Sequence, residues 1–156
     1  MLSRKSLLSL LAGAAASLAL PPFGIFPAIW CLAYPAAKFA CEERRSQALW
    51  IVAAMGMGWF TASTHWIAHS LLVGEAEFWY LLPLAALGVP AFLTLFWVVA
   101  GAVAWQHQCS ASVRLIWLLL GLAVAEFARG HVAAGFPWNS PGYTLSAHIW
   151  LLQAAS

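Results

Sequence analysis

Long apolar runs separated by short polar stretches divide the chain into six segments. Five runs cover residues 7–20, 25–40, 49–72, 78–105 and 113–130, and a sixth begins at 145 and continues to 156. A helix needs about 20 residues to cross the hydrocarbon core of a bilayer. The pattern therefore predicts an all-α fold, a polytopic transmembrane helix bundle with five spans plus the start of a sixth. The sixth run shows no stop signal, so we expect the chain, residues 1–156, to be the N-terminal transmembrane region of a longer protein.

The first run has two interpretations. Arg4 and Lys5 precede it and Pro21 and Pro22 end it, which is the layout of a secretory signal peptide. From the pattern alone, a cleaved signal and a retained helix fit equally well. The next stretch, 22–27, is only a tight turn before another apolar run. Two short spans joined by a proline-rich hairpin fit this pair of runs better than a signal followed by a mature start.

Glycines and prolines inside the long runs carry predictions about packing. Gly56 and Gly58 lie in the third run, where small residues let a second helix approach closely. Pro83 and Pro90 lie in the fourth run and are expected to kink it, which neighbouring helices tolerate in a bilayer.

Composition supports a membrane protein and excludes other classes. Apolar residues make up 63% of the chain and charged residues 8%, whereas a soluble domain carries about 25% charged residues. The basic residues are scattered, so nucleic acid is not a predicted partner. The three cysteines, Cys31, Cys41 and Cys109, match no disulfide or metal framework. We interpret them as small apolar residues.

The basic residues also predict the orientation. With five spans, six of them fall on one side of the membrane, together with the N-terminus: Arg4, Lys5, Lys38, Arg44, Arg45 and Arg114. Arg129 falls on the other side with Glu75 and Glu77. Cytoplasmic loops are the ones enriched in Lys and Arg. We therefore predict a cytoplasmic N-terminus and an external loop at 131–144, which in a bacterium is periplasmic.

The most distinctive stretch begins at the end of the fifth run. Glu126 and Arg129 are three residues apart, so they share one helix face. A loop rich in glycine, proline and aromatic residues follows, from Gly135 to Tyr143. Charged groups at membrane depth are costly and usually pair or face a cavity. One interpretation is a structural ion pair at a helix end, with an interfacial aromatic anchor behind it; the other is a functional site.

Other constellations are weak. His65 and His69 share a helix face and could hold a metal, but no third ligand follows at a telling spacing. Hydrogen bonding between helices is the simpler interpretation, and we predict no metal and no cofactor. No stretch assembles a nucleophile, a base and an oxyanion site.

Several motifs together resemble a known family. Glu126-Phe-Ala-Arg-Gly130, then Gly135-Phe-Pro-Trp138 and Gly142-Tyr143, are similar to the signature of bacterial apolipoprotein N-acyltransferases. Weaker similarities to that family are found in order along the chain, at 20–27, 56–60, 65–67 and 150–156. The Gly-Phe-Pro-Trp loop after Glu-Phe-x-Arg-Gly is the specific part.

The resemblance implies an integral enzyme of the bacterial inner membrane, acting in the last step of lipoprotein maturation. It moves an acyl chain from a phospholipid donor to the N-terminal amine of the diacylglyceryl-cysteine of an apolipoprotein. The family retains its first helix, which favours a span over a signal at 7–20. It has eight spans, and a nitrilase-like α/β domain whose Glu-Lys-Cys triad forms a cysteine thioester.

That α/β domain is absent from this chain, so the resemblance places no catalytic residue here and the 156 residues alone are predicted to be inactive. What it implies for them is membrane anchoring and helices that give lipid access. It also implies support of the periplasmic face by seven residues: Glu126, Arg129, Gly135, Phe136, Pro137, Trp138 and Tyr143. The alternative function is a non-enzymatic multi-span module, such as a transporter half or a lipid-binding scaffold.

Overall fold

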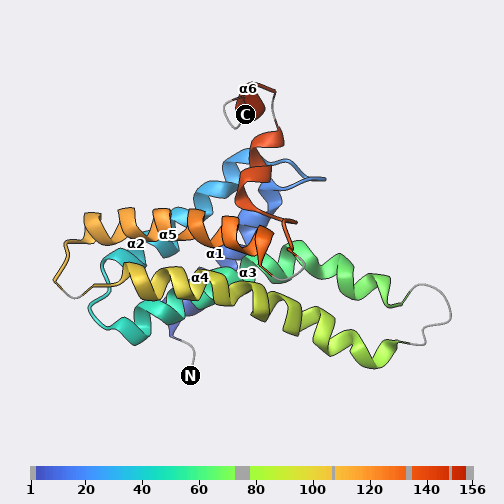
Figure 1. The fold of residues 1–156 in the computed structure, drawn as a ribbon, viewed down its shortest axis with the longest axis horizontal. Coiled ribbons are helices and arrows are strands. Elements are labelled where there is room, and N and C mark those ends of the chain that lie inside the picture. The colour runs from blue at the N-terminus through green and yellow to red at the C-terminus, as the bar shows by residue number, and fades with distance from the viewer. Residues whose placement is uncertain (1–2, 73–77, 107, 133–134, 148, 154–156) are drawn as a thin grey trace.

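The structure describes residues 3–72, 78–106, 108–132, 135–147 and 149–153, and all the regular secondary structure in these ranges is helical. The structure is a computed structural model. Helices α3, α4 and α5 run side by side along the longest axis, and α1 crosses them (Figure 1). Glu75 and Glu77, and the end of the sixth run at 154–156, lie outside the described residues.

The first two apolar runs form an antiparallel hairpin. Helix α1, Arg4–Ala16, starts at Ser3, whose hydroxyl accepts the backbone N–H of Ser6 as an N-cap. A short 3₁₀ helix, η1 (Ser17–Ala19), and a turn follow, and the chain returns as η2 (Phe26–Leu32) and α2 (Ala33–Ala40). Lys5 at the start of α1 reaches Glu42 beyond α2, at 2.7 Å, so the two open ends of the hairpin are joined.

The second run is only partly α-helical, unlike the single helix that its apolar character predicts. Residues Phe26–Leu32 form a 3₁₀ helix instead. Pro35 explains much of this, because its nitrogen cannot donate to the carbonyl of Cys31 four residues earlier. In a 3₁₀ helix, a carbonyl accepts from the N–H three residues later, so the carbonyl of Cys31 does not depend on Pro35.

The long helices follow. Helix α3 runs from Arg45 to Ser70, and α4 from Val89 to Ala104. Between them lie the 3₁₀ helix η3 (Trp79–Leu81) and a π-helical turn, η4 (Leu84–Gly88). This turn interrupts the α-helical pattern between Pro83 and Pro90, the two residues expected to disturb the fourth run. Helix α5, Ala111–His131, begins with the hydroxyl of Ser110 accepting the N–H of Val113.

Two helices meet the length and composition of a membrane span within the described residues: Trp79–Ala104 and Ala111–His131. Most of their side chains are not buried inside the protein. Exposed apolar residues such as Leu95, Val99 and Val124 cover their outer faces. Such surfaces suit lipid rather than water.

Helices α1 and α3 are in backbone contact. A Cβ atom added at Gly13 would lie 2.1 Å from the carbonyl oxygen of Met55, and one added at Gly58 would lie 1.9 Å from that of Leu10. Gly56 faces Thr94 of α4, with 2.9 Å from its virtual Cβ to the Thr94 methyl group. The glycines of the third run therefore do admit close neighbours, as predicted, and Gly58 admits α1.

The buried core lies between α1, α3 and α4, with contributions from α2 and α5. Its largest fully buried apolar side chains are Trp59, Trp97, Phe39, Phe60, Ile51, Met55, Leu93 and Leu118. Beyond α5, the chain continues through a loop into η5 (Pro141–Ala147) and α6 (Ile149–Gln153), which point away from the layer of long helices (Figure 1).

A cluster of four residues, Lys5, Glu42, Trp105 and Arg114, joins the helix ends on the side of the N-terminus. The backbone carbonyl of Glu42 accepts hydrogen bonds from Trp105 Nε1, at 3.0 Å, and from Arg114 Nη1, at 2.7 Å. The Arg114 guanidinium also lies over the Trp105 ring, 5.1 Å from its centre. This Glu42 cluster connects the start of α1, the end of α2, the end of α4 and the start of α5.

Candidate functional site

Glu126 and Arg129 form a buried ion pair at the end of α5. Arg129 Nη2 lies 2.5 Å from Glu126 Oε2, and Nε lies 3.4 Å from Oε1. The Arg129 side chain is only 1% exposed and that of Glu126 13%. The i, i+3 spacing therefore brings the two groups together, as the sequence predicts.

Arg129 also binds the loop that follows its own helix. Its Nη1 donates to the backbone carbonyls of Phe136 and Trp138, the latter at 2.8 Å. In return, the backbone N–H of Phe136 donates to the carbonyl of Arg129 at 2.9 Å. The guanidinium is planar and its donors point in several directions, so one side chain satisfies a carboxylate and two carbonyls together. Arg129 thus fixes the loop against α5.

Residues from α3 and α4 complete the cluster. Trp97 Nε1 donates to Glu126 Oε1 at 2.7 Å, so this carboxylate has a second partner. The Arg129 guanidinium lies over the Phe60 ring, 5.4 Å from its centre, and Phe60 packs edge-to-face on Trp97 at 5.1 Å. Hydrogen bonds and a cation–π contact reduce the cost of burying the charges.

Two residues of the loop have a left-handed backbone. Gly135 has φ +68°, and a Cβ atom there would lie 2.4 Å from the carbonyl oxygen of Gly130. Asn139 has φ +58°, a conformation that Asn tolerates better than most residues. Its side-chain amide donates to the carbonyl of Ser63 at 2.9 Å, and its own carbonyl accepts from Trp59 Nε1 at 3.0 Å. The loop is thereby joined to α3 as well as to α5.

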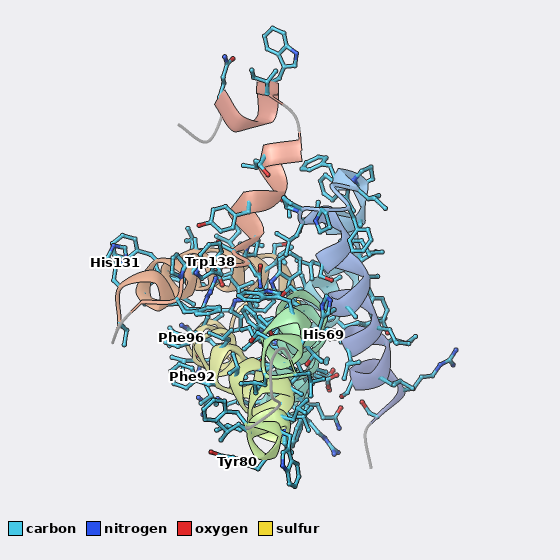
Figure 2. All side chains as sticks on the ribbon, turned by 90° about the vertical axis from the view of Figure 1, so that its right-hand side faces the viewer. His69, Tyr80, Phe92, Phe96, His131 and Trp138 are labelled. Atoms are coloured by element: carbon cyan, nitrogen blue, oxygen red, sulfur yellow. The ribbon has the colours of Figure 1, made fainter. Side chains whose placement is uncertain are left out.

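The other predicted site residues have different environments. Phe136 packs partly buried against the core. Pro137 and Trp138 are exposed, Trp138 to 59%, and Tyr143 is exposed to 46%. Trp138 lies near the base of the segment that rises away from the long helices, with His131 to one side (Figure 2). Of the seven predicted residues, four thus form the inner part of the site, Glu126, Arg129, Gly135 and Phe136, and three its surface, Pro137, Trp138 and Tyr143.

The sequence did not indicate four partners: Trp59, Phe60, Trp97 and Asn139. A buried ion pair at membrane depth does imply further hydrogen-bond donors. The ten tryptophans are the obvious source of donors in so apolar a chain, but nothing in their spacing singles out Trp59 or Trp97.

The chemistry of this arrangement is structural. Each of the three guanidinium nitrogens donates to a named oxygen, and both Glu126 oxygens accept. His65 and His69 are exposed near the end of α3, and His65 Nδ1 donates to the carbonyl of Ala62 at 2.7 Å. Among the described residues, no three His, Cys, Asp or Glu side chains lie close enough together to hold a metal ion.

Comparison with known proteins gives a consistent result. Residues 12–156 match the family model described as the apolipoprotein N-acyltransferase N-terminal domain. The chain is similar to the protein named apolipoprotein N-acyltransferase of Rhodopseudomonas palustris, with 35% identity over 160 residues, 98% of this chain and 30% of that protein. The proteins of the same name from Rhizobium etli and Brucella suis are 38% and 34% identical, over 97% and 98% of this chain. The chain spans about 30% of the length of these curated relatives.

Proposed function

The chain belongs to the apolipoprotein N-acyltransferase N-terminal domain family, and from this premise we propose that it forms the membrane part of an N-acyltransferase. The reaction would transfer an acyl chain from a phospholipid to the N-terminal amine of a lipidated cysteine of an apolipoprotein. The observation that carries this proposal is the family match, which covers residues 12–156. The names of the relatives, with matches over nearly the whole of this chain, support it.

The proposal assigns no chemical step to these residues. The cysteine thioester and its triad, which only the resemblance implies, are placed by this proposal in the part of the enzyme that these residues do not cover. Glu126 is held by Arg129 and Trp97, which leaves it poorly suited to move protons. Cys109 lies between α4 and α5, at the helix ends opposite to Arg129. We expect residues 1–156 alone to show no acyl transfer.

We propose five membrane crossings, the start of a sixth, a cytoplasmic N-terminus and a periplasmic 131–144 loop. The supporting observation is that several helix ends lie together on each side of the protein. The Glu42 cluster joins the start of α1, the end of α2, the end of α4 and the start of α5. On the opposite side, Leu20 and Pro21 after α1 line one cavity with Trp66 of α3 and with Asn139 in the loop after α5. Asn139 also donates to Ser63 in the last third of α3. Helices that alternate direction across a bilayer give this grouping.

Single-cysteine variants test this orientation. In intact cells, Trp138→Cys should react with a membrane-impermeant maleimide, because Trp138 is exposed on the proposed outer face. A variant that keeps only the native Cys41, which is also exposed, should react only after the membrane is permeabilised. The reverse labelling pattern would overturn the proposed orientation.

The face formed by α4 and α5 suits contact with lipid. A groove of about 580 Å³ runs between the two helices, and the twelve residues that line it are apolar or glycine. Phe92 and Phe96 form part of one wall, and both project from the same side of α4 (Figure 2). This supports the proposed role of the helices in lipid access.

In this proposal, Arg129 fixes the periplasmic loop so that it can support the catalytic part of the enzyme. In a full-length protein that carries these residues, Arg129→Ala should reduce acyl transfer or protein accumulation by at least about tenfold, since an unpaired buried carboxylate costs several kcal/mol. Arg129→Lys should recover only part of the loss, because Lys cannot bind a carboxylate and two carbonyls in one plane. The readout is the mass of the N-terminal peptide of a lipoprotein, with protein amount measured by immunoblot.

Arg4→Ala is the matched control, because Arg4 is an exposed arginine at the opposite end. Unchanged transfer and unchanged accumulation in Arg129→Ala would refute the role of the loop.

A further inference from the structure

A second cavity lies beside the Arg129 site and has aromatic walls. Its volume is about 430 Å³, and it opens between the 20–21 turn after η1, the α3 helix and the segment after α5. Trp66, Trp138 and Tyr143 line it, and the remaining apolar lining comes from Leu20 and Pro21. These three side chains are between 46% and 59% exposed, so their rings can be reached from outside the protein.

The backbone around this cavity is held in place. The carbonyl of Trp138 accepts from Arg129 at 2.8 Å. Next to it, Asn139 donates to the carbonyl of Ser63, which lies one helical turn before Trp66 on α3. These bonds hold together the backbone segments that carry the aromatic rings. Segments that are already held together lose less entropy when a ligand fills the space between them.

Charge identifies the class of ligand. Among the described residues that line the cavity, none carries a formal charge at neutral pH, and the polar groups are the Asn139 amide and the hydroxyls of Tyr143 and Ser146. An anion such as a phosphate would find no Lys or Arg there. Aromatic faces are the negative side of the ring quadrupole, and several around one point are the usual recognition of organic ammonium groups.

We propose that this cavity binds an organic ammonium ion, namely the trimethylammonium group of a choline head group. The proposal rests on the proposed function, which places the cavity at the outer membrane surface beside phospholipid. Interfacial Trp and Tyr often act only as membrane anchors. Anchors, however, are spread around a protein, whereas here three aromatic residues from α3 and the segment after α5 line one cavity, together with the polar side chains of Asn139 and Ser146.

Binding can be measured directly. The chain would be placed in nanodiscs of phosphatidylglycerol and titrated with soluble dihexanoylphosphatidylcholine, with saturation transfer to the choline methyl protons as the signal. Dihexanoylphosphatidylglycerol is the control ligand, because it shares the tails and phosphate and lacks the ammonium. Saturable binding of the choline lipid, at least about tenfold tighter than that of the glycerol lipid, is expected. Equal affinities for the two lipids would overturn the proposal. Tighter binding of the glycerol lipid would also overturn it, and would indicate an anion site instead.

Variants locate the binding. The double variant Trp66→Leu with Tyr143→Leu keeps apolar side chains but removes two aromatic rings. It should weaken binding of the choline lipid at least about tenfold. Trp66→Phe keeps a ring and should stay within about threefold of the unchanged protein, which provides a second test if the double variant does not fold. Trp50→Leu, an exposed tryptophan at the other end of α3, is the matched control and should change nothing. An unchanged affinity in the double variant, or a loss with Trp66→Phe as large as tenfold, would contradict the proposal.

The two proposals fail separately. If acyl transfer in the full-length protein does not depend on Arg129 while the choline lipid still binds, the proposed role of the loop fails and the cavity stands. If transfer depends on Arg129 but the choline lipid does not bind, only the cavity proposal fails.

Discussion

At the scale of single residues, Arg129 illustrates how a local prediction becomes a tertiary site. Its pairing with Glu126 follows from helix geometry, because residues three apart share a face. Its bonds to the carbonyls of Phe136 and Trp138 depend on how the loop folds back, and that depends on Gly135 and Asn139 adopting positive φ. No spacing rule gives the bond between Asn139 and Ser63, which are 76 residues apart.

Gly135 gives a sharp test of this loop. Gly135→Ala should lower the free energy of unfolding by about 2 to 4 kcal/mol, because Ala is strained at this φ and its Cβ would meet the Gly130 carbonyl. Gly130→Ala is the matched control: its new Cβ would lie 3.9 Å from Pro137, and a helix gains up to about 1 kcal/mol from the change. Unfolding by SDS in mixed micelles measures both. Similar stabilities for the two variants would show that the loop is not fixed as described.

At the scale of elements, the apolar runs predict the helices well, and prolines and glycines decide their details. The two prolines of the fourth run flank a π-helical turn, and Pro35 accompanies a 3₁₀ stretch in the second. The sequence indicated that Gly56 and Gly58 would face other helices. It did not indicate which helices these would be. Only the structure shows that Gly13 of α1 and Gly58 of α3 lie at the same helix crossing.

Gly58→Ala should separate α1 from α3. The new Cβ would lie 1.9 Å from the carbonyl oxygen of Leu10, and a backbone atom cannot rotate away as a side chain can. We expect a loss of about 3 kcal/mol or more in the free energy of unfolding. Gly121→Ala should cost about 1 kcal/mol or less, because the nearest atoms to its new Cβ are the methyl carbon of Ala100 at 3.2 Å and the carbonyl oxygen of Ala100 at 3.3 Å. Equal losses in the two variants would mean that the crossing of α1 and α3 is not held by close backbone contact.

At the scale of the whole molecule, the charged residues are sorted between two ends. The Glu42 cluster ties four helix ends together on the side of the N-terminus, and the Arg129 site ties α3, α4 and α5 to the loop on the other. The Glu42 carboxylate lies outside the long apolar runs. Its hydrogen bond with Lys5 lowers its pKa below the usual value, against the opposing effect of burial. The same pair raises the pKa of Lys5.

These shifts predict a pH dependence. A carboxyl group whose pKa is lower in the folded state stabilises the fold above its unfolded pKa of about 4.3, and that stability is lost as the pH falls through the lowered folded pKa. Lys5 acts in the opposite sense. Its contribution to stability is complete below its unfolded pKa of about 10.4 and is lost as the pH rises through its raised folded pKa. Glu42→Gln should therefore destabilise the protein at pH 7 and flatten the acid part of the stability profile.

Thermal unfolding in neutral detergent between pH 7 and pH 3 measures this effect. Glu43→Gln is the matched control, because Glu43 is the exposed neighbour outside the cluster. If the Glu42→Gln and unchanged proteins lose stability in parallel over this range, the ion pair does not stabilise the fold.

The sequence by itself determined the helical class, the approximate limits of the helices and the pairing of Glu126 with Arg129, because apolar periodicity and helix geometry act over a few residues. The motif after Glu126 also indicated the family, to which the chain belongs. Only the tertiary structure decided that Trp97 and Phe60 complete the Arg129 site, that α1 crosses α3 at two glycines, and that Trp66 shares a cavity with Trp138 and Tyr143. These contacts join residues far apart in the chain, and their partners depend on how the helices pack rather than on any local preference.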